Sequence, residues 1–262
     1  MGKRLPLTND EQKEFAKILQ SLASSKSTWQ VWQDFISFMA WSTAAVAASA
    51  VLDKAEIKTR EQQMQDILNR YKPEEQMLLA DLAAITAMAL TRNPAQNFLG
   101  TLYMGFGFEN SRQGQFFTPW VVSYAMALMT GYDEVTSDKP FISLIDSACG
   151  SGCMLIAKAA AYRKLGGIHD YRKDILFVGQ DLDPVVAKMC YIQLSLLDCA
   201  GYVIIGNTLI HTAAGSILAP HSNSNEVELL FTPMWNSEIW LVRRAHYTVN
   251  NILDNNDTFN HT

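Results

Sequence analysis

The pattern of apolar and polar positions changes its period near the middle of this chain. Up to about residue 92, apolar residues recur at helical spacing: Phe15, Ile18, Leu19 and Leu22 share one face of a helix that Asn9 or Asp10 can cap. From residue 141 onward, short apolar runs of strand length alternate with helical segments. This order is typical of an α/β fold with a mainly parallel sheet, preceded by a helical domain.

Three more helices are expected in the first part of the chain. Residues 56–71 are amphipathic, and a helix starting at Pro73 ends before Arg92-Asn93-Pro94. Before both of them, Phe35 to Leu52 carries no charge and could be a membrane span or a buried helix. Its Ala, Ser and Thr content and the absence of flanking basic residues favour the buried helix, so we expect no membrane association.

Strands are expected at residues 141–145, 175–179 and 202–205, and polar or glycine residues follow each one. The first is followed by Asp146 and a turn containing Gly150 and Gly152, and Ser151 between these glycines can cap the next helix. Because the carboxyl ends of parallel strands form a ligand crevice, these loops predict a nucleotide-like ligand there. A tight structural turn is the alternative interpretation of the glycines alone.

Four motifs in a fixed order make the pattern more specific: Gly114-Gln115-Phe116-Phe117-Thr118-Pro119, Asp146 to Gly152, Gly179-Gln180-Asp181-Leu182-Asp183-Pro184 and Gly206-Asn207-Thr208-Leu209. Over roughly residues 97–210 the chain resembles the adenine-N6 DNA methyltransferases, most closely the modification subunits of type I restriction systems. The resemblance implies a doubly wound, Rossmann-like sheet and S-adenosylmethionine as cofactor.

By matching positions, the resemblance implies a set of cofactor-binding residues: Phe117, Thr118, Asp146, Ala148, Cys149, Gly150, Gly152, Asp181, Leu182 and Asn207. Thr118 and the glycine loop would hold the methionine end. Asp181 would bind the ribose, Leu182 would pack on the adenine ring, and Asn207 would contact its edge. Family members more often carry Asp at the last of these positions.

The family's catalytic motif, Asn or Asp before Pro-Pro and an aromatic residue, does not occur in this sequence. Its expected place is after a fourth strand at residues 227–231, where the chain has Thr232-Pro233-Met234-Trp235. Thr232, Pro233 and Trp235 are therefore the candidate catalytic residues, with Trp235 stacking on a flipped adenine. We expect this segment to face the cofactor's methyl group.

Composition limits the function further. The net charge of −5 disfavours a strongly basic nucleic-acid binder, so DNA contact would come from a local patch or a partner subunit. The four cysteines form no CxxC pair, and we expect buried thiols and no metal site. Met1 to Asp10 is polar and no apolar core follows, so we expect no secretory signal and a cytoplasmic protein.

These features lead to a division into a helical domain (1–95), a linker (96–113) and a methyltransferase domain (114–262). The aromatic residues of the linker could form a stacking surface for nucleic acid or pack between the domains. Two functions remain: an adenine-N6 DNA methyltransferase that needs a specificity subunit or a homo-oligomer, and a cofactor-binding relative acting as regulator, decoy or assembly subunit. A methyltransferase for RNA or protein is a third hypothesis.

Overall fold

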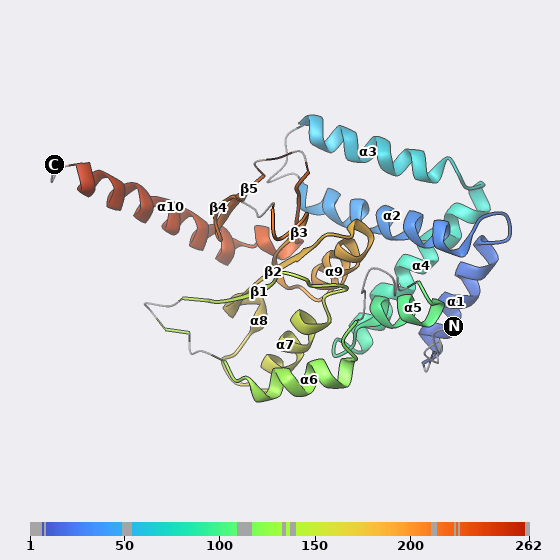
Figure 1. Cartoon of the computed structure of the whole chain (residues 1–262), viewed down its shortest axis with the longest axis horizontal. Helices are drawn as coiled ribbons and strands as arrows, with labels where there is room; N and C mark the ends of the chain where they lie inside the picture. Colours follow the sequence, from blue (N-terminus) through green and yellow to red (C-terminus); the bar gives the residue numbers. More distant parts are fainter. Residues whose placement is uncertain are drawn as a thin grey trace.

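A computed structural model of the chain describes residues 7, 9–48, 54–108, 117–132, 135–136, 140–210, 214–222, 224 and 226–259. A central sheet lies beside a group of helices formed by the first hundred residues (Figure 1). The helices are α1 (Asp10–Leu22), α2 (Thr28–Ala48), α3 (Lys54–Leu68), α4 (Pro73–Arg92), α5 (Phe98–Phe106), α6 (Trp120–Met129), α7 (Cys153–Arg163), α8 (Tyr171–Asp174), α9 (Pro184–Leu196), the 3₁₀ helix η2 (Pro233–Asn236) and α10 (Glu238–Phe259). The strands are β1 (Ile142–Asp146), β2 (Ile175–Asp181), β3 (Ala200–Ile205), β4 (Ala214–Ser216), β5 (Ala219–His221) and β6 (Glu228–Phe231).

The main sheet has the strand order β1-β2-β3-β6. β1, β2 and β3 are parallel, with Asp146 opposite Gly179 and Asp181 opposite Ile205 at their carboxyl ends. A helix lies in each crossover, α7 after β1 and α9 after β2. The expected α/β fold with a mainly parallel sheet is confirmed, and all the strands expected from the apolar runs are present.

β6 differs from the expected fourth strand in its direction. It pairs antiparallel with β3, so that Phe231 lies opposite Tyr202 and Glu228 opposite Ile205. The residues after β6 therefore emerge beside the start of β3. The chain between β3 and β6 also contains a short antiparallel pair, β4 and β5, which the apolar runs did not predict.

The helical part follows the apolar periodicity. The Asn9 side chain accepts a hydrogen bond from the Gln12 backbone N–H at 2.8 Å and caps α1, as predicted. The uncharged segment forms α2 up to Ala48, with Phe35 and Ile36 fully buried, while residues 49–52 lie outside the described part. Among the described residues, no helix combines the length and apolarity needed to cross a membrane.

One large hydrophobic core connects the helical part to the sheet. It contains side chains from α1, α2, α4 and α5 together with α7, α9 and one face of the strands. A second cluster covers the other face through η2 and the first turn of α10, with Trp235 and Trp240 buried. The two faces of the sheet are thus covered by different parts of the chain.

The segment expected to be a linker contains α5, and its described aromatic residues contribute to this core. Phe98 and Tyr103 are 0% and 1% exposed, and Phe98 packs edge-on against Phe15 of α1 at 6.0 Å between ring centroids. Rings buried this deeply cannot stack on a nucleobase, which supports the packing interpretation. Residues 109–113 of the expected linker lie outside the described part.

β1 is less covered than a central strand would be. Ile142 is buried and Leu144 is half-buried, whereas Ser143 and Ile145 are exposed, Ile145 to 65%. The short apolar run at residues 141–145 favours a strand that is covered on both faces, and β1 does not have this coverage. Within the described residues, β1 is the outermost strand of the sheet, with β2 as its paired neighbour.

Candidate cofactor site

The glycine loop turns sharply at the carboxyl end of β1. Gly150 and Gly152 have φ values of 55° and 87°, which lie in the left-handed region favoured by glycine. A Cβ atom at residue 152 would lie 2.8 Å from the Cys190 sulfur, so the loop also needs the space that glycine leaves. The Cys149 backbone N–H donates to the Gln180 carbonyl oxygen at 2.9 Å and holds the loop against β2.

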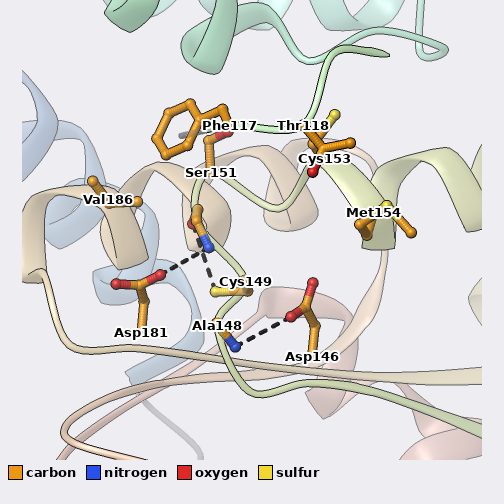
Figure 2. Close-up of a pocket in the computed structure, with 11 residues that line it drawn as sticks. Phe117, Thr118, Asp146, Ala148, Cys149, Ser151, Cys153, Met154, Asp181 and Val186 are labelled. Atoms are coloured by element: carbon orange, nitrogen blue, oxygen red, sulfur yellow. Dashed lines mark hydrogen bonds between the residues drawn. The ribbon is translucent and has the colours of Figure 1, made fainter. Parts of the chain in front are cut away.

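This loop borders a cavity of about 270 Å³ above the ends of β1 and β2. Figure 2 shows Asp146 and Asp181 on opposite sides of the loop, with Phe117 and Thr118 covering it from the segment before α6. The cavity brings together most of the residues that the resemblance implied: Phe117, Thr118, Asp146, Ala148, Cys149, Gly150 and Asp181.

Three implied residues do not line the cavity. Gly152 lies beneath the loop against Cys190, and Leu182 is 67% exposed just beyond Asp181. Asn207 follows β3, and its side-chain oxygen accepts a hydrogen bond from the Leu209 backbone N–H at 3.0 Å. The loop of Asn207 is nevertheless adjacent to the crevice, because the Gly206 N–H donates to the Asp181 carbonyl oxygen at 3.0 Å.

Four lining residues were not anticipated: Ser151, Cys153, Met154 and Val186. Ser151, Cys153 and Met154 lie in or directly after the glycine loop, so the sequence could have predicted them as further residues of that loop. Val186 lies in the first turn of α9, where its backbone N–H and that of Val185 donate to the capping side chain of Asp183. Its position depends on how α9 packs, which the residue pattern does not specify.

The Asp181 carboxylate organises the crevice. Its two oxygens accept hydrogen bonds from the Gly150 backbone N–H at 2.8 Å and from the Asp183 N–H at 3.0 Å. Each carboxylate oxygen has a further lone pair, so Asp181 can still accept hydrogen bonds from a bound ligand. A carboxylate at the end of the second strand is the group that binds a ribose diol in nucleotide-binding folds of this type.

Asp146 has a different electrostatic environment. Burial raises the pKa of its carboxyl group, and the negative charge of Asp181 raises it further. The hydrogen bond from the Ala148 backbone N–H, 3.2 Å from the carboxylate, opposes this effect. The crevice thus contains two carboxyl groups whose ionised forms repel each other.

The cysteines beside the loop are buried thiols, as expected. A hydrogen bond with the Cys190 thiol, together with burial, raises the pKa of the Cys149 thiol. Thiolate character is therefore disfavoured, which argues against a nucleophilic role. No group of metal-binding side chains occurs among the described residues.

Ser151 does not cap the following helix as predicted. The N-cap of α7 is Gly152, and no side chain accepts a hydrogen bond at that end. The Ser151 hydroxyl is instead buried against Asn97, whose side-chain Nδ2 donates to it at 2.8 Å. Ser151 thus bonds to a residue 54 positions away in place of the backbone N–H groups at the start of α7.

The candidate catalytic segment lies away from this crevice. Because β6 is antiparallel to β3, Thr232 emerges near Gly201, at the opposite end of the strand from Ile205 and Asp181. The Thr232 hydroxyl is fully buried, donates to the Cys199 carbonyl oxygen at 2.7 Å and accepts from the Gly201 N–H at 3.1 Å. The expectation that this segment faces the cofactor's methyl group is wrong.

Trp235 is correspondingly part of the core. It is 2% exposed and packs against Tyr202 and Phe231, each at 5.5 Å between ring centroids. The Arg244 guanidinium covers its ring from α10 at 4.3 Å, and the preceding Pro233 begins η2. In this arrangement Trp235 cannot form a stacking platform for a base above the cofactor crevice.

A comparison with known families identifies the chain. The model of the N-6 DNA methylase family matches residues 101–262, which is more than half of the sequence. The chain belongs to the N-6 DNA methylase family. S-adenosylmethionine is the cofactor of this family, in agreement with the resemblance seen in the sequence. No curated protein matches the chain.

Among solved structures, the chain is similar to a candidate class I S-adenosylmethionine-dependent methyltransferase from Listeria monocytogenes, at 16% identity and a TM-score of 0.40. The match covers 80% of this N-6 DNA methylase family member and 58% of the Listeria chain. The chain thus spans less than two thirds of that protein's length. The fold assignment rests on the strand pairing described above.

Proposed function

We propose that this chain binds S-adenosylmethionine and takes part in adenine-N6 DNA methylation together with a second polypeptide. The observation that carries this proposal is the separation of two sites. The crevice has the carboxylates and the glycine loop of a nucleotide site, while Thr232 and Trp235 are buried at the other end of β3.

The crevice fits the cofactor chemically. Asp181 has acceptor capacity left for the two hydroxyl groups of a ribose, and exposed Leu182 follows it as an apolar surface for the adenine ring. Thr118 and the glycine loop line the other side, where the methionine end would lie. The cavity of about 270 Å³ lies near the lower limit of small-molecule sites, so the ligand would extend beyond it toward Leu182 and Asn207.

The bound cofactor would supply an electrophilic methyl group. Adenine N6 is a poor nucleophile because its lone pair is delocalised into the ring, so acceptors for the two amino hydrogens and a stacking platform are needed. The segment expected to provide them is part of the core instead. We therefore assign these groups, and the choice of DNA sequence, to the second polypeptide. The net charge of −5 is consistent with DNA contacts made mainly by a partner.

Calorimetry with S-adenosylhomocysteine, the product of methyl transfer, tests the first part. We expect binding by the wild type and at least about tenfold weaker binding by Asp181→Ala, since hydrogen bonds to a charged group contribute about 1.5–3 kcal/mol. The control is Asp66→Ala, which removes an exposed carboxylate on α3. If the wild type gives no binding heat, or if both variants bind like the wild type, the assigned site is wrong.

A methyl-transfer assay with labelled S-adenosylmethionine tests the second part. We expect no incorporation into adenine-containing DNA by the chain alone, and incorporation once a specificity subunit is added. Efficient DNA methylation without a partner would contradict the proposal. Incorporation into RNA or protein would favour the other substrate classes.

A further inference from the structure

A buried hydrogen-bond network connects α5 and α9 to the glycine loop. Its centre is Asn97, the N-cap residue of α5, which is 5% exposed. Asn97 contacts Ser151 in the loop and Gln193 on α9, which are 1% and 0% exposed. The three residues are separated by 54 and 42 positions along the chain.

The polar groups of this network are well satisfied. The Gln193 amide nitrogen donates to the Asn97 side-chain oxygen at 2.9 Å and to the Ser151 carbonyl oxygen at 2.8 Å. Its amide oxygen accepts from the Leu99 backbone N–H at 3.1 Å. The Asn97 oxygen also accepts from the Gly100 N–H at 3.1 Å and caps α5. Because an unpaired polar group at such depth is costly, these bonds hold Ser151 in one place.

The position of Ser151 matters because it lies between the two left-handed glycines and lines the cavity. Its neighbour Gly150 donates the backbone N–H that binds the Asp181 carboxylate. A shift of Ser151 would therefore displace the Gly150 N–H from the Asp181 carboxylate. Neither Asn97 nor Gln193 lines the cavity, so both act on it through Ser151.

We propose that Asn97 and Gln193 are positioning residues that hold the glycine loop in its cofactor-binding conformation and link cofactor binding to the stability of α5. This inference rests on the proposed function of the crevice. The physical reason is shared geometry, because the same Asn97 side chain caps α5 and bonds to Ser151. A loop conformation that displaces Ser151 would therefore also weaken the hydrogen bond between Asn97 and the Gly100 N–H.

Gly100 offers a way to disturb the network from outside the crevice. A Cβ atom at this position would lie 2.2 Å from the Asn97 Nδ2 and 2.4 Å from the Ser151 Oγ. Gly100→Ala must therefore displace the Asn97–Ser151 pair, although alanine itself favours a helix. Thr101→Ala is the matched control on the same helix, because the Thr101 hydroxyl bonds to the Asn97 backbone carbonyl oxygen. Removing this hydrogen bond thus leaves the contacts of the Asn97 side-chain amide unchanged.

The experiment measures the affinity for S-adenosylhomocysteine by calorimetry and the amide hydrogen exchange of α5 with and without this ligand. We expect Gly100→Ala to bind about tenfold more weakly than the wild type and Thr101→Ala to bind like it. In the wild type, the ligand should slow exchange in α5, and Gly100→Ala should lose this protection.

A second variant guards against a folding defect in the first. Gln193→Met keeps the approximate size of the side chain and removes its three hydrogen bonds, and we expect the same weaker binding and loss of α5 protection. If the folded variants bind like the wild type, or if the ligand protects α5 equally in all proteins, the network is merely structural and the inference is wrong. If the wild type itself does not bind, the proposed function fails instead.

Discussion

Asp146 and Asp181 show how one residue type takes on two properties in neighbouring positions. The Asp181 carboxylate accepts hydrogen bonds from the Gly150 and Asp183 backbone N–H groups. The Asp146 carboxyl accepts one from Ala148, and burial together with the charge of Asp181 raises its pKa. Both residues end parallel strands, so the sequence pattern placed them in one crevice. The difference between them depends on how each loop turns.

Asp146→Asn should stabilise the folded chain near neutral pH. A raised pKa means that the folded state binds the Asp146 proton more tightly than the unfolded state, so this group favours folding at acidic pH and loses that effect as pH rises through its raised pKa. Asparagine has no such loss, and its oxygen can still accept from the Ala148 N–H. Urea unfolding across the acidic to neutral range measures the difference, which should grow with pH. A difference that is independent of pH would contradict this reasoning.

At the scale of elements, the direction of β6 has the largest consequence. The strand has four residues and pairs with β3 in the reverse sense, which places the following Thr232 and η2 in the second core cluster. Within the described residues, the crevice therefore lacks the expected catalytic segment. The hairpin of β4 and β5, which precedes β6, was also absent from the predicted elements.

Trp235→Ala should affect stability and leave cofactor affinity unchanged. Removing a buried tryptophan lowers the free energy of unfolding by about 3–5 kcal/mol, and the crevice lies at the other end of β3. Urea unfolding and calorimetry with S-adenosylhomocysteine measure the two effects. Should this variant not fold, Thr232→Val offers a milder change of about 1–3 kcal/mol through its two buried hydrogen bonds. Lost cofactor affinity with unchanged stability would indicate that this segment lies at the cofactor crevice, which would contradict the prediction.

At the scale of the whole molecule, the helical part and the sheet share one hydrophobic core. α2 packs on α9, and α5 is buried between the first helices and the glycine loop. The division into residues 1–95, 96–113 and 114–262 stays a proposal. This packing suggests that the two proposed domains depend on each other for stability.

We expect the full chain to unfold in one cooperative transition. Far-ultraviolet circular dichroism reports mainly the helices, while fluorescence reports the tryptophans, which occur in both parts of the chain. Because the shared core must open as a unit, the two signals should change together in urea. Two separate transitions would show that the proposed domains fold independently.

The local features of this protein could be predicted because they depend on neighbouring residues. The period of apolar positions located the helices α1 to α4 and the strands β1, β2, β3 and β6, whereas α5 lies in the segment expected to be a linker. The polar residues after parallel strands located the crevice, since carboxyl ends of such strands meet at one edge.

The tertiary structure decided what depends on distant contacts. The pattern of a short run such as Glu228–Phe231 does not specify the direction of the strand, so the orientation of β6 follows from its pairing with β3 and from the burial of Trp235. The role of Ser151 changed for the same reason: Asn97, 54 positions away, provides a hydrogen bond that the local helix end does not. Periodicity describes which side of an element is buried, whereas partner and direction are set by the packing of the whole chain.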